Sequence, residues 1–248
     1  MARARGCRQE EGGELKTDLV VTVEPRESSS LMALADLLCD RFEIEQQIQG
    51  GGMGEVFRAR DRVSGQTVAI KVIFDARDRR AARFVREIQL LSELSHPGIV
   101  RYICHGATPS GALFLAMEWL DGEALRCRLE REPLTVSESV ALATRVAEAL
   151  GAAHARGIVH RDLKPSNLFL IEGRIERVKL IDFGIARKGG LPPLTQTGMP
   201  IGTPGYMAPE QACSEGELDA RADVFALGCV LFQCLTGTLP FKGDSAIA

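Results

Sequence analysis

The stretch H-R-D-L-K-P-S-N at residues 160–167 constrains this chain more than any other feature. Pro165 bars the stretch from a helix interior, because proline has no backbone N–H and its ring clashes with the preceding turn. The side chains of Asp162, Lys164 and Asn167 are therefore expected on an irregular loop, where they can converge on one point. An aspartate can accept a proton, a lysine can hold a phosphate, and an asparagine carbonyl can bind a hard cation.

A second carboxylate follows in Asp182-Phe183-Gly184, fifteen residues after Asn167, beside a glycine that lets the chain turn. Two carboxylates, an ammonium and an amide are the parts that a phosphoryl transfer requires. The order H-R-D-L-K-P-S-N and then D-F-G resembles the catalytic loop and metal-binding motif of protein kinases.

A glycine-rich turn at residues 50–54 lets backbone lie against a ligand, since most of its positions lack a Cβ. A Rossmann fingerprint would lead into a helix, but residues 55–59 alternate like a strand and residues 67–73 form another, which excludes a dehydrogenase. A glycine loop followed by V-A-I-K resembles the kinase nucleotide lid and its lysine, Lys71. The chain departs from the family pattern at Gln49, where the first glycine of the loop is expected. The neighbouring Gly50 is the residue that would compensate for this missing glycine.

Glu87 lies beside the apolar face of a helix predicted at residues 81–94, and on its own it reads as a surface residue. The resemblance instead pairs Glu87 with Lys71. It also makes residues 118–122, which follow a buried strand at 113–117, a hinge between two lobes. Met117 would guard the back of the adenine pocket, and the backbone of Glu118 and Leu120 would bond the adenine edge. The nucleotide site it implies comprises Ile48, Gly50, Gly51, Gly52, Met53, Gly54, Val56, Ala69, Lys71, Met117, Glu118, Leu120, Asn167, Phe169 and Asp182.

Thr135 and Glu138 predict a capping box that opens a helix. We expect one apolar face of this helix to carry Val140, Ala143, Ala147 and Leu150, with His154 as a packed core histidine. A long loop then ends in G-T-P-G-Y-M-A-P-E at residues 202–210, which resembles a kinase activation segment. In the apolar helix after it, Asp223 is expected to anchor the catalytic loop.

The resemblance also implies a division of labour. Asp182 and Asn167 hold Mg²⁺, with Mn²⁺ as an alternative, against the phosphates of ATP, and Lys71 grips the α- and β-phosphates. Asp162 accepts the proton of a substrate hydroxyl, Lys164 stabilises the transferred group, and Thr203 steadies both. Arg161 is expected to bind a phosphorylated Thr195 or Thr197. An internal column would contain Leu91, Tyr102, His160 and Phe183.

The composition is that of an ordinary globular protein. The net charge of −3 predicts no general attraction to nucleic acid or membrane. The seven cysteines are scattered and never form C-x-x-C, which favours reduced thiols in the cytoplasm. The apolar run at residues 224–235 is too short to cross a bilayer.

These observations predict an α+β, bilobal kinase fold. Residues 1–40 form a loosely ordered leader, residues 41–122 the N-lobe and hinge, and residues 123–248 a C-lobe without its last helices. Further domains are expected beyond residue 248. By resemblance Glu210 would lack its arginine partner, so we expect this chain alone to be marginally stable or inactive.

Lys164 and the G-T-P-G-Y-M-A-P-E segment resemble those of serine/threonine kinases more than those of tyrosine kinases. The sequence of the glycine loop is similar to that of bacterial kinases of the eukaryotic-like type. The expected substrates are proteins with Ser or Thr hydroxyls. The main alternative is a pseudokinase or inactive fragment that acts as a nucleotide-binding or docking module. A small-molecule phosphotransferase is less consistent with a loop built to receive a peptide.

Overall fold

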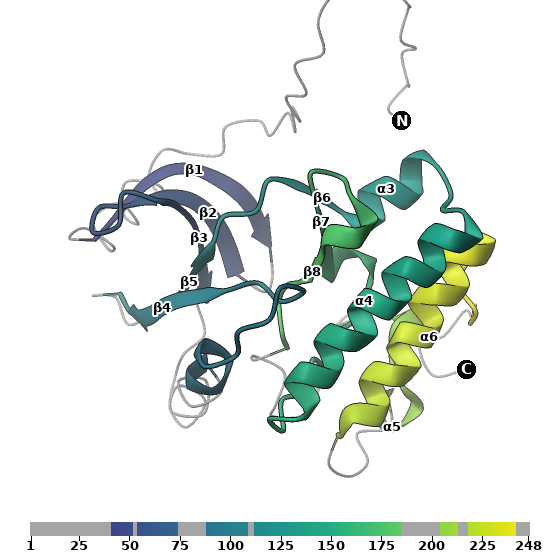
Figure 1. Cartoon of the computed structure of the whole chain (residues 1–248). Coiled ribbons are helices and arrows are strands. Elements are labelled where there is room, and N and C mark those ends of the chain that lie inside the picture. Colours follow the sequence, from purple (N-terminus) through teal and green to yellow (C-terminus); the bar gives the residue numbers. More distant parts are fainter. Residues whose placement is uncertain are drawn as a thin grey trace, which may run out of the picture.

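The computed structural model describes residues 41–51, 54–73, 88–108, 112–184, 204–212 and 218–241. A five-stranded antiparallel sheet stands at one end, and helices with a small second sheet form the other (Figure 1). This confirms the predicted α+β, two-lobed fold, with a β-rich lobe first and a mainly helical lobe after it.

The N-terminal sheet has the strand order β1-β2-β3-β5-β4. In the central strand, β3, successive side chains point to opposite faces of the sheet. Val68, Ile70 and Val72 are fully buried in the core of this lobe, whereas Ala69 and Lys71 occupy the alternate positions. The strands are β1 (Phe42–Gly51), β2 (Gly54–Asp61), β3 (Thr67–Ile73), β4 (Tyr102–Ala107) and β5 (Leu113–Glu118).

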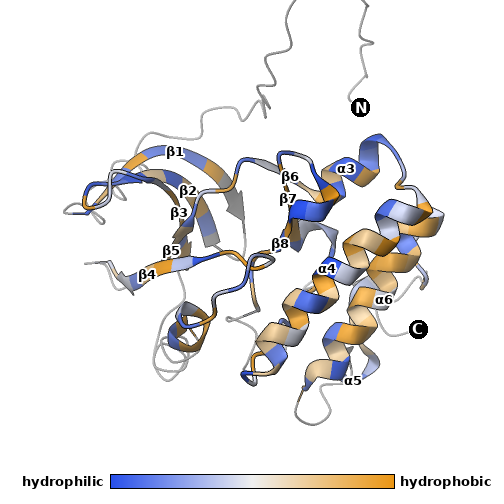
Figure 2. Ribbon diagram, in the orientation of Figure 1, coloured by the Kyte–Doolittle hydropathy of each residue, from blue (hydrophilic) through white to orange (hydrophobic). Residues whose placement is uncertain are grey.

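In the second lobe, α4 and α6 pack side by side, and Figure 2 shows hydrophobic residues along most of α6. Three short strands pair in the order β6-β7-β8 next to them. The helices are α3 (Leu125–Arg131), α4 (Val136–His154), α5 (Pro209–Ala212) and α6 (Ala220–Thr236). The short strands and 3₁₀ turns are β6 (Gly122–Ala124), η1 (Pro165–Asn167), β7 (Leu168–Ile171), η2 (Ile175–Arg177), β8 (Val178–Leu180) and η4 (Pro204–Tyr206).

Helix α4 confirms one prediction and corrects another. The capping box is present, with the Thr135 hydroxyl accepting from the Glu138 N–H and the Glu138 side chain accepting from the Thr135 N–H. The predicted apolar face is wrong, because Val140 is 54% exposed and Ala147 is also exposed. Alanines occur on both candidate faces, so their spacing could not decide between them. The buried residues are Ser139, Leu142, Val146, Ala149, Leu150 and Ala153.

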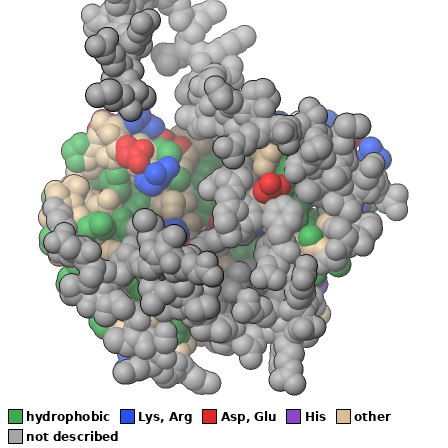
Figure 3. Space-filling view, turned by 180° about the vertical axis from the view of Figure 1, so that it is seen from behind, with side chains coloured by type: hydrophobic (Ala, Val, Ile, Leu, Met, Phe, Trp, Pro, Cys, Tyr) green, Lys and Arg blue, Asp and Glu red, His purple; other side chains and the backbone are tan. Residues whose placement is uncertain are grey.

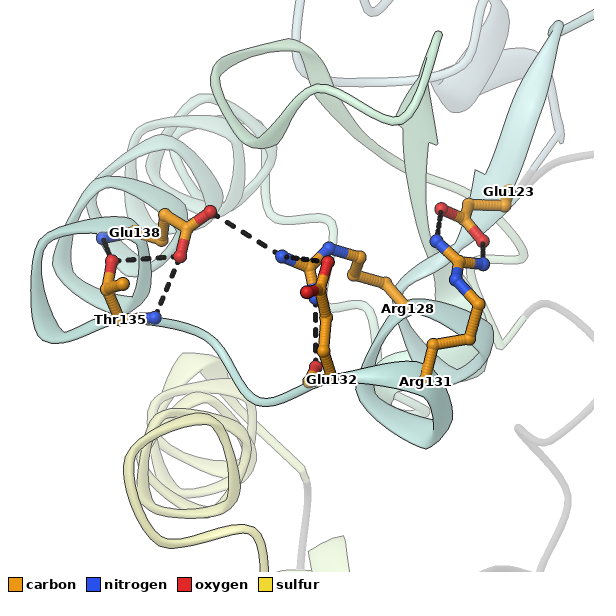
Figure 4. A network of polar contacts seen from close by, with 6 residues as sticks. All are labelled: Glu123, Arg128, Arg131, Glu132, Thr135 and Glu138. Carbon is orange, nitrogen blue, oxygen red and sulfur yellow. Dashed lines mark hydrogen bonds and ion pairs between the residues drawn. The ribbon is translucent and has the colours of Figure 1, made fainter. Parts of the chain in front are cut away.

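A polar network fastens α3 to its neighbours. Arg131 forms an ion pair with Glu123 on β6, while Arg128 lies 3.0 Å from Glu132 and 3.6 Å from Glu138 at the start of α4. The short helix after the hinge is thus held at both sides by charge pairs. Figure 4 shows the whole network, which comprises Glu123, Arg128, Arg131, Glu132, Thr135 and Glu138.

The two lobes are joined by backbone as well as by the hinge. The Val100 N–H donates to the Leu180 carbonyl at 3.0 Å, and the Leu180 N–H donates to the Gly98 carbonyl at 2.8 Å. Ile99 and Leu180 thereby form a parallel bridge. This pairing places the segment that leads into β4 next to β8, and β8 leads directly to Asp182.

The described surface has no single sign of charge. Acidic and basic side chains lie next to each other on the face shown in Figure 3, and ion pairs such as Arg58–Glu45 occur on the N-terminal sheet. No helix among the residues described is long and apolar enough to traverse a bilayer.

Candidate active site

The catalytic-loop residues lie together, as the proline-containing spacing predicted. Pro165 begins the turn η1, and this turn brings Asn167 back toward Asp162. The Asn167 amide donates to the Asp162 backbone carbonyl at 2.7 Å and to its Oδ2 at 3.1 Å. Lys164 Nζ lies 3.0 Å from the same Oδ2. One carboxylate oxygen therefore receives both an ammonium and an amide.

Asp182 enters the site from the other side. Lys71 Nζ, which comes from the middle of β3, lies 2.8 Å from Asp182 Oδ1. The Ile181 N–H donates to the Asn167 carbonyl at 3.0 Å, so the chain leading to Asp182 is bonded to the catalytic loop. Asp182 has a φ of 56°, a left-handed conformation that non-glycine residues adopt rarely. The geometry joins a lysine of one lobe to a carboxylate of the other.

His160 connects the two carboxylate segments. Its ring is fully buried, with Nε2 3.0 Å from the Ile181 carbonyl and Nδ1 accepting from the Asp162 N–H at 3.3 Å. Because a carbonyl can only accept, Nε2 carries the proton. Burial lowers the pKa of His160, so the ring is neutral and keeps this tautomer. His160 therefore links the two segments, because one ring nitrogen accepts from the Asp162 N–H and the other donates to the Ile181 carbonyl.

Asp223, in the first turn of α6, anchors the loop from below, which confirms the sequence prediction. Its Oδ2 accepts from the His160 N–H at 2.7 Å, and its Oδ1 accepts from the Arg161 N–H at 2.8 Å. His154 Nε2 lies 2.7 Å from Oδ2, so His154 is a polar partner rather than only a packed core residue. The carboxylate is 1% exposed, and these bonds offset the cost of burying it.

The predicted internal column is buried throughout, at Leu91, Tyr102, His160 and Phe183. The rings of His160 and Phe183 have centroids 4.6 Å apart. Burial raises the pKa of the Tyr102 hydroxyl, and the nearby Asp182 carboxylate acts in the same direction. His160 therefore packs against the residue that follows Asp182 in the chain.

The residues predicted around adenine come from both lobes. Ala69 lies opposite Met117 in the β3–β5 pairing, Val56 lies opposite Lys71, and Phe169 is half-buried on β7. The Glu118 N–H donates to the Arg101 carbonyl at 2.9 Å, and the contact of Glu118 with an adenine edge remains a prediction. Leu120 packs on the hydrophobic cluster that contains residues of both lobes, and Ile48 is 42% exposed on β1.

The glycine-rich turn closes a β-hairpin. Gln49 pairs with Val56, Gly50 with Glu55, and Gly51 with Gly54 in the β1–β2 ladder. Several predicted residues lie outside the described part of the chain, namely Gly52, Met53, Glu87, Thr195, Thr197 and Thr203. Their assignments remain predictions.

Sequence reasoning missed a polar junction behind the hinge. The Glu118 carboxylate accepts from the Arg101 N–H at 2.8 Å and forms an ion pair with Lys179 on β8. Glu118 and Lys179 are 61 residues apart, and no local pattern links them. Their contact depends on how the two lobes are joined.

The predicted metal ligands are one carboxylate, Asp182, and one amide, Asn167. Among the described residues no three His, Cys, Asp or Glu side chains gather as a metal site. A set of two oxygen ligands suits Mg²⁺, which commonly keeps several waters and substrate phosphate oxygens in its coordination shell. The donor set is therefore compatible with a metal that arrives with a nucleotide.

A bilobal frame that carries this loop, this lysine and these two carboxylates is the arrangement that the sequence resemblance predicts. The chain belongs to the protein kinase family, because the family model described as "Protein kinase domain" matches residues 42–248.

Bacterial relatives are similar over most of the chain. Serine/threonine-protein kinase pkn3 of Myxococcus xanthus is 42% identical over 217 residues, which cover 84% of this chain and 40% of that protein. PknD of Mycobacterium tuberculosis is 41% identical over 208 residues, or 82% of this chain and 31% of PknD. PknB of the same species is 41% identical over 222 residues, or 85% of this chain and 35% of PknB. The chain thus spans less than half the length of each relative.

Proposed function

We propose that this chain is the catalytic part of a serine/threonine protein kinase that transfers the γ-phosphoryl group of ATP to protein hydroxyls. The main observation in support is that Lys164 and Asn167 both contact Asp162, while Lys71 of one lobe pairs with Asp182 of the other. The names of the bacterial relatives support the same activity.

In this mechanism Asp162 orients the substrate hydroxyl and accepts its proton as the oxygen bonds to the γ-phosphorus and the bond to the β-phosphate oxygen breaks. Lys164 stabilises charge on the transferred group, and Lys71 holds the α- and β-phosphates. Because the transition state is loose, positioning and charge stabilisation carry most of the rate enhancement. Asn167 and Asp182 would hold Mg²⁺ or Mn²⁺, which supplies positive charge against the phosphates.

Phosphorylation of Thr195 or Thr197 is part of the proposal, since a phosphate near Arg161 would gain charge-assisted hydrogen bonds. A cytoplasmic location is also proposed. It is supported by the four cysteines among the described residues, all of which are free thiols and two of which, Cys229 and Cys234, are buried.

The test is Asp162→Asn, assayed with radiolabelled ATP on a generic basic protein. Transfer should fall by roughly 10²–10⁴, with ATP affinity nearly unchanged because Asp162 does not hold the nucleotide. Asp219→Asn is the matched control, since Asp219 caps α6 and should leave transfer intact. Equal turnover in wild type and Asp162→Asn refutes the assigned role. ATP binding without transfer by the wild type favours a pseudokinase.

A further inference from the structure

Gln211, on the short helix α5, reaches back to the catalytic loop. Its Nε2 donates to the Arg161 carbonyl at 3.0 Å, and its Oε1 accepts from the Ala208 N–H at 3.2 Å. These two partners fix the orientation of the amide, because a carbonyl can only accept and an N–H can only donate. Gln211 and Arg161 are 50 residues apart, so this contact is a product of the tertiary fold.

Arg161 needs such a contact. Its φ is 64°, in the left-handed region that costs a non-glycine residue free energy and persists where surrounding groups enforce it. Asp223 Oδ1 binds the Arg161 N–H at 2.8 Å from one side. Gln211 binds the Arg161 carbonyl from the other. Both backbone polar groups of the strained residue are therefore held by side chains of different helices.

The carbonyl of Arg161 and the N–H of Asp162 belong to one peptide plane. The Asp162 N–H donates to His160 Nδ1 over a long 3.3 Å, whereas the Gln211 amide donates to the Arg161 carbonyl at 3.0 Å. Of these two bonds, the shorter one from Gln211 does more to set the tilt of this plane. Because the tilt directs the Asp162 side chain, an error here would displace the carboxylate relative to a substrate hydroxyl.

Gln211 also lines a small pocket with Arg161, Asp162, Lys164, Tyr206 and Met207. The 204–212 segment is tied to α6 by a second bond, from the Tyr206 hydroxyl to the side-chain amide oxygen Oε1 of Gln233. The segment is thus anchored once to the helical core and once to the catalytic loop.

We infer that Gln211 is a positioning residue for Asp162, which couples the placement of the 204–212 segment to the orientation of the catalytic base. This inference rests on the proposed kinase function. It assigns to Gln211 no contact with substrate or nucleotide.

Gln211→Glu tests the inference with almost no change in shape. The carboxylate still accepts from the Ala208 N–H, but it cannot donate to the Arg161 carbonyl and places negative charge beside it. We expect kcat to fall about tenfold, the effect of leaving one such acceptor unsatisfied, with the Kd for a fluorescent ATP analogue within about twofold of wild type. Gln211→Met, which also lacks the donor, should behave alike.

Gln233→Glu is the matched control, since its carboxylate still accepts from the Tyr206 hydroxyl; kcat should not change. Wild-type kcat in both Gln211 variants overturns the inference. A joint loss of ATP affinity and cooperative melting overturns it too, because that result indicates a general structural role.

A second readout separates this inference from the proposed function. Amide hydrogen exchange at Arg161 and Asp162 should be faster in Gln211→Glu than in wild type and unchanged in Gln233→Glu. If the wild type transfers no phosphate, the kinase proposal fails, and the exchange rates still decide whether Gln211 holds the loop. Equal exchange in all three proteins rules out the positioning role.

Discussion

Lys71 and Asp182 form a direct ion pair across the two lobes, with Nζ 2.8 Å from Oδ1. The lysine side chain is 20% exposed and the aspartate 36%, so the pair borders the interior without being sealed in it. Both residues are assigned to the nucleotide site. Their pairing means that the two lobes are already linked through the groups that are proposed to receive phosphate and metal.

Lys71→Met should lower kcat/KM for ATP by roughly 10² or more, because a preorganised charge aimed at the phosphates is lost. Stability should change little, since a partly exposed ion pair contributes about 0–1 kcal/mol. Steady-state ATP dependence and thermal melting measure the two effects. Arg62→Met, which removes a cation paired with Glu43 on the outer sheet at 3.7 Å, should change neither. Near-normal kcat/KM in Lys71→Met contradicts the assignment.

Local chemistry made the catalytic loop predictable. Pro165 cannot lie in the interior of an α-helix, and the short spacing then favours placing Asp162, Lys164 and Asn167 around one turn. The capping box at Thr135 was predictable for the same reason, since all its atoms lie within four residues. The family resemblance assigned Lys71 and Asp182 to one nucleotide site, but it paired Lys71 with Glu87. The direct contact of Lys71 with Asp182, 111 positions further along the chain, was not predicted.

Other features depend on packing between distant elements. Gln211 meets Arg161 only because α5 folds back beneath the catalytic loop, and nothing near Gln211 in sequence indicates this. The buried face of α4 was misjudged for a related reason. Small alanines make two neighbouring stripes equally apolar, and contact with α6 selects the one with Leu142 and Val146.

Gly122, at the end of the hinge, should not tolerate a side chain. Its φ is 150°, and a Cβ would lie 2.0 Å from the Leu170 carbonyl oxygen across the β6–β7 pairing. Gly122→Ala should therefore lower the free energy of unfolding by more than about 2 kcal/mol, as measured by urea denaturation. Gly151→Ala is the control on α4, where a Cβ meets nothing within 4 Å. It should stabilise by about 0.5–1 kcal/mol. Equal effects of the two substitutions would contradict this reading.

Asp61 should contribute to stability against acid. Both oxygens of this buried carboxylate receive the Arg41 guanidinium at 3.0 Å, and the Val63 N–H and Ser64 hydroxyl add further bonds. These bonds, Arg41 first, lower the pKa of Asp61 from 3.8 to about 2, against the opposing effect of burial. Since the folded-state pKa is lowered, the stabilisation is present above pH 4 and is lost as the pH falls toward 2.

Asp61→Asn should remove about 1–2 kcal/mol at neutral pH, less than the full shift because Arg41 is partly exposed. The variant should also lose part of the dependence of unfolding free energy on pH between 4 and 2. Urea denaturation at a series of pH values measures both. Asp219→Asn, at an exposed carboxylate whose pKa is also lowered by an arginine, should change the curve less. Parallel curves for wild type and Asp61→Asn would count against the pairing.

Glu118 and Lys179 should be energetically coupled, because their ion pair joins the end of β5 in the first lobe to β8 in the second. The side chains are 21% and 19% exposed, so solvent screens them less than a surface pair. Glu118→Gln keeps an acceptor for the Arg101 N–H, and Lys179→Met keeps the aliphatic stem, so each variant removes little besides the charge interaction. In a double-mutant cycle of unfolding free energies, the coupling should be about 1–2 kcal/mol.

The comparison cycle is Arg145–Glu148 on α4, a pair at 3.0 Å whose side chains are 55% and 50% exposed. Its coupling should be below about 0.5 kcal/mol, the usual value for an exposed helical pair. If distance alone mattered, the two pairs would have similar coupling energies. A difference between their coupling energies therefore measures the effect of burying the Glu118–Lys179 pair between the lobes. If the Glu118 and Lys179 substitutions are additive within about 0.3 kcal/mol, the pair does not link the lobes energetically, and the backbone bonds between residues 98–100 and Leu180 carry that connection instead.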